Sequence, residues 1–481
     1  MKKISVYRKL LVLLTCIWLC GCTTNLDRLP LDFLEEQQSF VTENDALLAL
    51  NGVYDQLRGS NYYGLGWLIL STVNADDGSV QTVANANLVE IDHNTFTAAN
   101  NYFDNFYVAA FQMIDRANRV IYNVPTMDFN PTLQRQIVGE AKFLRALGYF
   151  DLVRAFGDVP LVTEPAKDII NVRIERTNKD LVYQQIVQDL LDAEEVLPIN
   201  YTAANQIGRA TSGAAKSLLA KVYLTLKDWS GAAQKSKEVI DSGTYTLFPD
   251  YKDVFDPTNN NGMEHIFSIQ YSCIQLRYGS SFSKNFAIHF SYPFGGGGVF
   301  QTNDFFADAF PDDDYRKEIT VITEKLMPDG SIVESRTGPH TDKYWDPAPC
   351  GDNYNRNNFM VIRYADVLLM YAEAENEING ATDAAYDAIN QVRARARNGN
   401  PQAVPQDLSG LSQAEFREAV AQERLWELSF EGHRRWDLLR TGQYLTVMRA
   451  AGIAAEEHHL LYPIPQNEID VNPELIQNPG Y

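Results

Sequence analysis

Cysteine is scarce in this sequence, with 5 among 481 residues. Three of them stand within the first 22 residues, so that only Cys273 and Cys350 lie in the rest of the chain. These two have no Cys-x-x-Cys spacing, which argues against a zinc site. In an oxidising compartment they form a disulfide; otherwise they are two small buried hydrophobic residues. A chain of this length can build a large hydrophobic core, so its stability requires neither a disulfide nor a bound metal.

Positive charge is also in short supply. Lys and Arg number 41 against 62 Asp and Glu, which gives a formal net charge of -21 and a pI near 4.8. A surface of this sign repels phosphate backbones, and nucleic-acid binding is therefore excluded as a function class.

Long hydrophobic runs are lacking, although hydrophobic residues reach 45% and charged residues 21%, as in ordinary globular proteins. This composition excludes a disordered chain, a collagen-like fibre and a polytopic membrane protein. The apolar run 10–19 spans about ten residues, which is too few to cross a bilayer. It follows the basic residues Lys2, Lys3, Arg8 and Lys9, a pattern typical of a signal peptide.

The apolar run ends in Leu19-Cys20-Gly21-Cys22, which resembles the bacterial lipobox. The resemblance implies cleavage before Cys22 and acylation of the Cys22 thiol and of the new amino group. Several acyl chains anchor a protein stably, whereas one chain is marginal. We therefore predict a lipoprotein signal peptide over 1–21 and a lipidated tether over 22–41.

Signatures of catalysis and of metal binding are missing. No G-x-S-x-G and no H-E-x-x-H motif occurs, and the glycine run 295–298 lacks the Lys-Ser/Thr of a phosphate loop. Glu373 and Glu377 share one face of a predicted helix, whereas glycoside hydrolysis needs carboxylates on both sides of a cleft. His458 and His459 have no third ligand nearby at a regular spacing, and the acidic run 312–314 lacks the pattern of a calcium loop. We expect no enzymatic activity, no cofactor and no metal.

What the sequence does contain is a series of helical patterns, recognised by apolar residues at helical spacing and by capping residues at their ends. The predicted helices are 44–57, 104–124, 131–156, 180–197, 211–227, 229–242, 363–379, 382–397, 413–430 and 434–440. Several form hairpin pairs that resemble tetratricopeptide-type repeats. The predicted fold is mainly α, a tetratricopeptide-like helical-repeat scaffold of four helix pairs.

Two long insertions, 58–103 and 244–362, interrupt the repeats of about 42–243 and 363–440. They are rich in Gly, Asn and β-type residues and show no clear helical period, so we expect loops with short strands. Long ordered insertions on a helical scaffold are usually functional. Because no Pro/Ser-rich linker divides the chain, residues 42–481 are predicted to form a single domain.

The segment 413–440 is dense in charge of both signs at spacings of three and four. A carboxylate pair or an anion clamp is one interpretation. A salt-bridge network that fixes the last helices to the repeats is the interpretation we favour. Removal of Glu373, Glu427 or Glu431 should accordingly lower stability.

Several stretches, in their order along the chain, match one family. They are GEAKFLRALGYF at 139–150, FGDVPL at 156–161, RAT at 209–211, AAKSLLAKVYL at 214–224, RYADVLLMYAEA at 363–374, INQVRARA at 389–396, FEGHR at 430–434, WDLLR at 436–440, LYPIPQNEI at 461–469 and QNPGY at 477–481. Together they resemble the SusD/RagB family of Bacteroidetes surface lipoproteins, from the lipobox to the last residue.

This resemblance implies a lipid-anchored protein of the outer membrane that faces the exterior and acts as a lid on a SusC-like TonB-dependent transporter. The implied activity is capture of an oligosaccharide without catalysis. Two alternatives stay open: the same scaffold captures peptides, as RagB-like relatives do, or it is an interaction scaffold with no small ligand.

The insertions bring aromatic rings together with Asn, Asp and Arg, the side chains that a sugar needs for its apolar face and for its hydroxyl fringe. Trp67 and Trp345 stand out because their sequence neighbours are small or polar. The candidate ligand-binding residues are Trp67, Tyr62, Tyr63, Asn85, Tyr278, Tyr292, Phe294, Tyr344 and Trp345.

Overall fold

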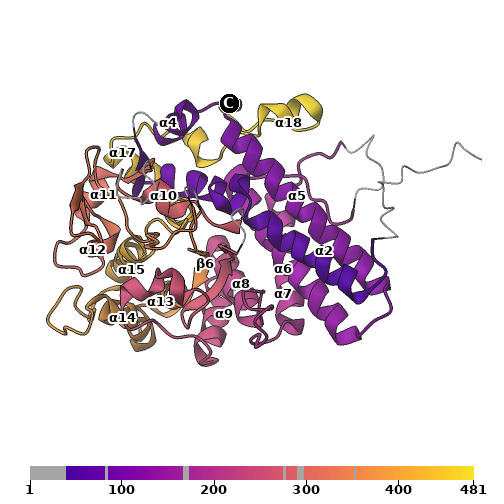
Figure 1. Ribbon diagram of the computed structural model, residues 1–481, viewed down its shortest axis with the longest axis horizontal. Coiled ribbons are helices and arrows are strands. Elements are labelled where there is room, and N and C mark those ends of the chain that lie inside the picture. The colour runs from indigo at the N-terminus through magenta and orange to yellow at the C-terminus, as the bar shows by residue number, and fades with distance from the viewer. Residues whose placement is uncertain (1–38, 82–84, 166–172, 275–277, 290–296, 352–353) are drawn as a thin grey trace, which may run out of the picture.

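Long helices make up most of the protein (Figure 1). The computed structural model describes residues 39–81, 85–165, 173–274, 278–289, 297–351 and 354–481. The long helices are α2 (Glu43–Leu57), α5 (Asn101–Asn123), α6 (Pro131–Phe156), α7 (Lys179–Val196), α8 (Ser212–Leu226), α9 (Trp229–Asp241), α13 (Tyr364–Asn379), α14 (Asp383–Ala396) and α15 (Gln413–Leu428). In Figure 1, α2, α5, α6 and α7 lie side by side at one end of the molecule, and α13, α14 and α15 lie at the other.

Each helix packs against the next along the chain, as in a helical repeat. The contacts give four successive pairs, α2 with α5, α6 with α7, α8 with α9, and α13 with α14. The prediction of a mainly α, tetratricopeptide-like scaffold of four helix pairs is confirmed.

Capping residues explain why the helices begin close to the predicted positions. Thr42 and Asp45 form a capping box at the start of α2, where the Asp45 carboxylate accepts a hydrogen bond from the Thr42 amide at 2.7 Å. Ser412 and Glu415 do the same for α15. Pro131 occupies the first turn of α6, where its missing N–H costs no helical hydrogen bond.

The strands are short and pair two by two. In the described part of the chain, β1 (Gly78–Val80) pairs with β3 (Phe300–Thr302), β2 (His265–Ile269) with β6 (Phe359–Arg363), and β4 (Glu324–Leu326) with β5 (Ile332–Glu334), all antiparallel. Every residue of β2 and β6 is buried, and both strands contact α8. The β2–β6 ribbon therefore ties the second insertion to the middle of the helical body.

The first insertion differs from its prediction. After α2 the chain turns through η2 (Ser60–Gly64), α3 (Gly66–Leu68) and η3 (Ile69–Val73), and α4 (Ala86–Asp92) follows β1. Residues 62–64 and 66–73 are buried, with η2 and α3 packed against α5. The expected loop with short strands is wrong for residues 60–73, because these tight helical turns carry apolar side chains into the core.

The second insertion and the C-terminal region consist of short elements. They are η5 (Tyr251–Val254), η6 (Pro257–Asn259), α10 (Phe282–Phe286), α11 (Asp304–Ala309), α12 (Lys317–Thr320), α16 (Arg434–Arg440), α17 (Tyr444–Ala450), η8 (Glu457–Leu460) and α18 (Gln466–Val471), while η4 (Val124–Thr126) joins α5 to α6. The main hydrophobic core reaches from Ala46 to Leu475, while the buried residues of η5 and α17 belong to two smaller clusters.

Buried ion pairs connect the second insertion to α15. Glu427 lies at their centre and is fully buried. One of its carboxylate oxygens accepts hydrogen bonds from Arg363, at 2.6 Å, and from Arg395, and the other accepts one from Arg316 at 3.0 Å. Glu431 pairs with Lys343 and Arg363 in the same interior.

Further pairs extend this arrangement toward α13 and α16. Arg424 bridges Asp366 and Asp437, and Arg440 binds Glu373. The predicted salt-bridge network, which places Glu373, Glu427 and Glu431 in the scaffold, is confirmed.

Candidate functional site

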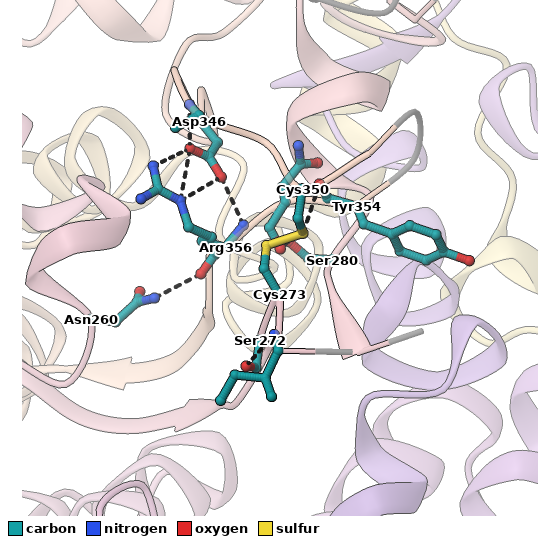
Figure 2. Close-up of a disulfide and its surroundings, with 11 residues drawn as sticks. Asn260, Ser272, Cys273, Ser280, Asp346, Cys350, Tyr354 and Arg356 are labelled. Atoms are coloured by element: carbon teal, nitrogen blue, oxygen red, sulfur yellow. Dashed lines mark hydrogen bonds and ion pairs between the residues drawn. A yellow bond between two sulfur atoms is a disulfide. The ribbon is translucent and has the colours of Figure 1, made fainter. Parts of the chain in front are cut away.

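A disulfide joins two segments of the second insertion (Figure 2). Cys273, after β2, bonds to Cys350, before β6, with 5.5 Å between their Cα atoms. The sequence left this pairing open, and the structure shows that it forms. The cross-link fixes the backbone on either side of it.

Hydrogen bonds reinforce the same region. The amide of Ser272 donates to the carbonyl of Tyr278 at 2.7 Å, and the backbones of Ser280 and Asn355 exchange two hydrogen bonds of 2.9 and 2.7 Å. The backbone at Tyr278 and Ser280 is thus bonded to two other parts of the insertion.

Arg356 and Asp346 form the polar side of this region in Figure 2. The guanidinium of Arg356 lies 2.5 Å from the Asp346 carboxylate, which also accepts the Arg356 amide at 2.8 Å. Burial alone would raise the pKa of Asp346, but the hydrogen bonds from Arg356 lower it below the usual range. Asn260 holds the carbonyl of Arg356 at 2.7 Å, so the loop is anchored to η6 as well.

A hollow of about 340 Å³ adjoins this segment, and we call it the first hollow. Its walls come from the end of α2, from β2 and from the chain that follows β2. The lining residues are Asn51, Tyr54, Asp55, Leu57, Arg58, Phe267, Ser268, Ile269, Gln270, Tyr271, Ser272 and Tyr278. Its size lies at the lower end of the range of small-molecule sites.

Tyr278 and Arg58 are the distinctive pair of the first hollow. The guanidinium carbon of Arg58 lies 3.5 Å from the centroid of the Tyr278 ring, a cation–π contact. Asp55 forms an ion pair with Arg58 and orients it from the helix side. Asn51 and Ser272 are further polar side chains of the hollow, so it combines a flat ring with a polar fringe. The Gln270 amide is already bonded to Asn261, Ser268 and Asn358.

A second hollow of about 290 Å³ lies on the other side of the α2 end. It is lined by Gln56, Gly59, Ser60, Asn61, Tyr62, Asp104, Asn105, Val108, Ala109 and Gln112. Amide side chains dominate this set. One oxygen of Asp104, Oδ1, is buried without a hydrogen-bond partner among the described residues.

Three predicted ring candidates prove to be core residues. Trp67 is 3% exposed and stacks on Trp436, with 5.1 Å between the ring centroids. Tyr62 and Tyr63 are also buried, and both hydroxyls donate to Asp151, at 2.9 and 2.8 Å. Trp67 and Tyr63 line neither hollow, because the turns of η2 and α3 direct these rings into the core, and as sugar platforms these two predictions are wrong. Tyr62 lies in the wall of the second hollow.

Tyr344 is a further correction. It is buried, and its hydroxyl donates to the carbonyl of Phe430 at 2.9 Å. Its neighbour Trp345 is partly exposed, but its ring packs under the Lys325 ammonium at 4.2 Å and does not line the first or the second hollow.

The remaining candidates have separate outcomes. Asn85 is exposed and caps α4 by accepting a hydrogen bond from the Asn87 amide, away from both hollows. Tyr292 and Phe294 lie outside the described residues. Of the predicted rings, the structure brings only Tyr278 into the first hollow.

Sequence reasoning missed Arg58 and Gln270. Arg58 directly follows the predicted first helix, and no motif in the adjacent sequence indicates a ligand site. Its function as a partner of Tyr278 arises from a contact between segments far apart in the sequence, which periodicity and motifs do not report.

A helical-repeat scaffold that carries an aromatic, amide-lined hollow beside its inserted segments is a binding architecture. Comparison with known proteins gives the family. The model described as the SusD family matches residues 328–481, and the model described as starch-binding associating with outer membrane matches residues 33–224. These matches support a SusD/RagB family protein.

Relatives and solved structures agree with this assignment. SusD-like proteins P25 and P2 of Formosa agariphila are each 29% identical to this chain, over 98% of it and 99% of their own length. A SusD homolog from Bacteroides thetaiotaomicron has a TM-score of 0.84 at 26% identity, covering 93% of this chain and 98% of its own.

Two further structures carry names that describe glycan binding. A laminarin-binding SusD-like protein matches with a TM-score of 0.79 at 26% identity, over 92% of this chain and all of its own. Surface glycan-binding protein A from Bacteroides fluxus matches with a TM-score of 0.78 at 25% identity, over 92% of this chain and all of its own. At the level of the family, these names describe binding proteins for glycans.

Proposed function

We propose that this protein captures an oligosaccharide at the outer surface of the cell and delivers it to a SusC-like TonB-dependent transporter. Family membership supports the general activity. We place the site at the contact of Arg58 with Tyr278. The Tyr278 ring is partly exposed in the first hollow, and polar side chains surround it.

The chemistry of the first hollow suits a sugar. The Tyr278 ring offers a flat apolar surface for the C–H face of a pyranose, and Asn51, Arg58 and Ser272 offer groups for its hydroxyls. The second hollow, across the α2 end, adds Asn61 and Asn105. The protein binds and releases the glycan without chemical change.

Truncation of Tyr278 tests this location. We expect Tyr278→Ala to weaken oligosaccharide binding at least about tenfold, because a central aromatic anchor contributes about 2 kcal/mol or more. Isothermal titration against a panel of oligosaccharides and peptides measures the effect and also separates glycan capture from the RagB-like alternative.

Tyr122→Ala is the matched control for this titration, since Tyr122 is 51% exposed on α5 and lines neither hollow. Unchanged affinity in Tyr278→Ala would place the glycan elsewhere. Binding of peptides in preference to every oligosaccharide would favour the RagB-like function, and binding of neither would favour the scaffold without a small ligand.

We also propose that the Cys22 lipid is the membrane anchor. Cys22 lies outside the described residues, and among the helices of the described residues none is long and apolar enough to cross a membrane. Cys22→Ser should abolish fatty-acid labelling and move the protein from the membrane to the soluble fraction. Labelled lipid on the Cys22→Ser protein would refute the lipobox assignment.

The transporter partnership rests on the family alone. We expect a SusC-like barrel to co-purify with the protein from outer membranes solubilised in mild detergent. Recovery of the protein as a monomer, without a stoichiometric amount of the barrel, would contradict the partnership.

A further inference from the structure

A third hollow of about 480 Å³ continues from the second along the outer face of α5. It shares Val108 and Gln112 with the second hollow. Its other walls come from the segment after α6 and from the C-terminal region around α18. The lining residues are Tyr107, Val108, Phe111, Gln112, Asp115, Arg116, Pro160, Val162, Ile174, Glu468, Val471, Asn472 and Leu475.

The Tyr107 hydroxyl is unusual for a buried group. Tyr107 is 3% exposed, and its hydroxyl has no hydrogen-bond partner among the described residues. A buried phenol normally finds a partner, because leaving it unpaired costs free energy. Tyr149, one helix away, follows the rule: its hydroxyl bonds the amide and the carbonyl of Val162 at 2.7 and 2.8 Å.

Glu468 faces the same hollow from α18. Burial raises the pKa of the Tyr107 hydroxyl well above its ordinary value, and the Glu468 carboxylate acts in the same direction, which places the two groups within electrostatic reach. They do not bond each other directly, so a hydroxyl between them would both donate to the carboxylate and engage the phenol.

The remaining walls combine apolar residues with the polar side chains of Gln112, Asp115, Arg116 and Asn472. The Phe111 ring packs against the Tyr107 ring with 4.8 Å between centroids, and Val162 and Leu475 lie on the other side. A surface of this kind, with two polar groups at one place, matches the C–H face and the hydroxyl edge of one sugar ring.

We propose that the third hollow is an additional sugar subsite, which lengthens the glycan-binding surface along α5. This inference rests on the proposed function. The second and third hollows share the lining residues Val108 and Gln112, so a glycan seated in the second hollow extends along α5 into the third. The protein therefore prefers a longer oligosaccharide to the disaccharide of the same glycan.

Titrations with malto- and laminari-oligosaccharides, each from the disaccharide to the hexasaccharide, test the subsite. We expect Tyr107→Phe to weaken binding of the hexasaccharide about three- to tenfold and to leave the disaccharide unchanged, as for the loss of one hydrogen bond. The ring and its packing remain, and no internal hydrogen bond is lost, so the fold is preserved.

A second variant blocks the hollow instead of removing a group from it. Val471 is 76% exposed at the rim, so Val471→Trp can fill the entrance without disturbing the core. It should reproduce the selective loss for the hexasaccharide. Tyr122→Phe, the same change on an exposed part of α5, should bind both lengths as the wild type does.

The outcomes separate this inference from the proposed function. Equal affinity of the wild type for short and long oligosaccharides, with both variants unaffected, would overturn the subsite and leave the first hollow as the site. An equal loss of affinity for the disaccharide and for the hexasaccharide would also overturn the inference, because an additional subsite affects only the longer glycan. Absence of binding by either series at any length would count against the proposed function, and the subsite would fall with it.

Discussion

Replacement of Glu427 by alanine is expected to lower the free energy of unfolding by about 3–5 kcal/mol, the usual cost of removing one partner from a buried ion network. Glu427 accepts hydrogen bonds from Arg316, Arg363 and Arg395, all of them buried. Without it, three guanidinium groups share fewer carboxylates inside the protein. Urea unfolding of the wild type and the variant measures the difference.

Glu418→Ala on the same helix is the control, because Glu418 is exposed and a surface substitution of this kind changes stability by about 0.5 kcal/mol or less. A cost for Glu427→Ala as small as that of Glu418→Ala would mean that the network does not hold the insertion to α15.

The contribution of the Glu427 carboxylate to stability depends on pH. Burial alone would raise the pKa of Glu427, but the surrounding arginines lower it well below its ordinary value of 4.5. A carboxylate whose pKa is lower in the folded state stabilises the fold above its unfolded pKa and loses this contribution as the pH falls. The stability gap between wild type and Glu427→Gln should therefore be full at about pH 7 and shrink below about pH 4.5.

Trp67→Ala should lower the free energy of unfolding by about 3–5 kcal/mol, the typical cost of truncating a buried aromatic residue. The indole lies between Trp436 and Phe106, with centroid distances of 5.1 and 5.9 Å, and the Arg154 guanidinium sits 4.9 Å from its centroid. Removing it opens a cavity where three helical segments meet. Thermal or urea unfolding detects the loss.

Trp345→Ala provides the contrast, since both tryptophans looked alike in the sequence. Trp345 is partly exposed and packs under Lys325, so we expect a cost of about 1 kcal/mol. If the Trp67→Ala protein is as stable as the wild type but binds glycan more weakly, Trp67 is a ligand-binding residue and the correction made above is wrong.

Local signals account for the parts of the fold that the sequence predicted. The apolar stripes and caps of α2, α6 and α15 are properties of neighbouring residues, so their positions could be derived without the structure. The charge spacing in 413–440 likewise predicted a network, although its partners Arg316 and Lys343 in the second insertion could not be identified.

The candidate site was harder to predict because burial depends on distant segments. Trp67 stands between Gly66 and the apolar run 68–70, and Trp436 from α16 covers it. Tyr278 contacts Arg58, which directly follows α2 and lies far from it in the sequence. A single sequence contains no local signal for either contact.

The disulfide between Cys273 and Cys350 has a consequence for the thermodynamics of binding. Cross-linking residues 77 positions apart removes conformational entropy from the unfolded chain, worth about 4–5 kcal/mol in the loop-closure model. In the folded protein the same bond ties the chain that follows β2, in the wall of the first hollow, to the chain before β6. At the proposed site a glycan then meets a wall that is already ordered, and less of its interaction energy is spent on ordering the protein.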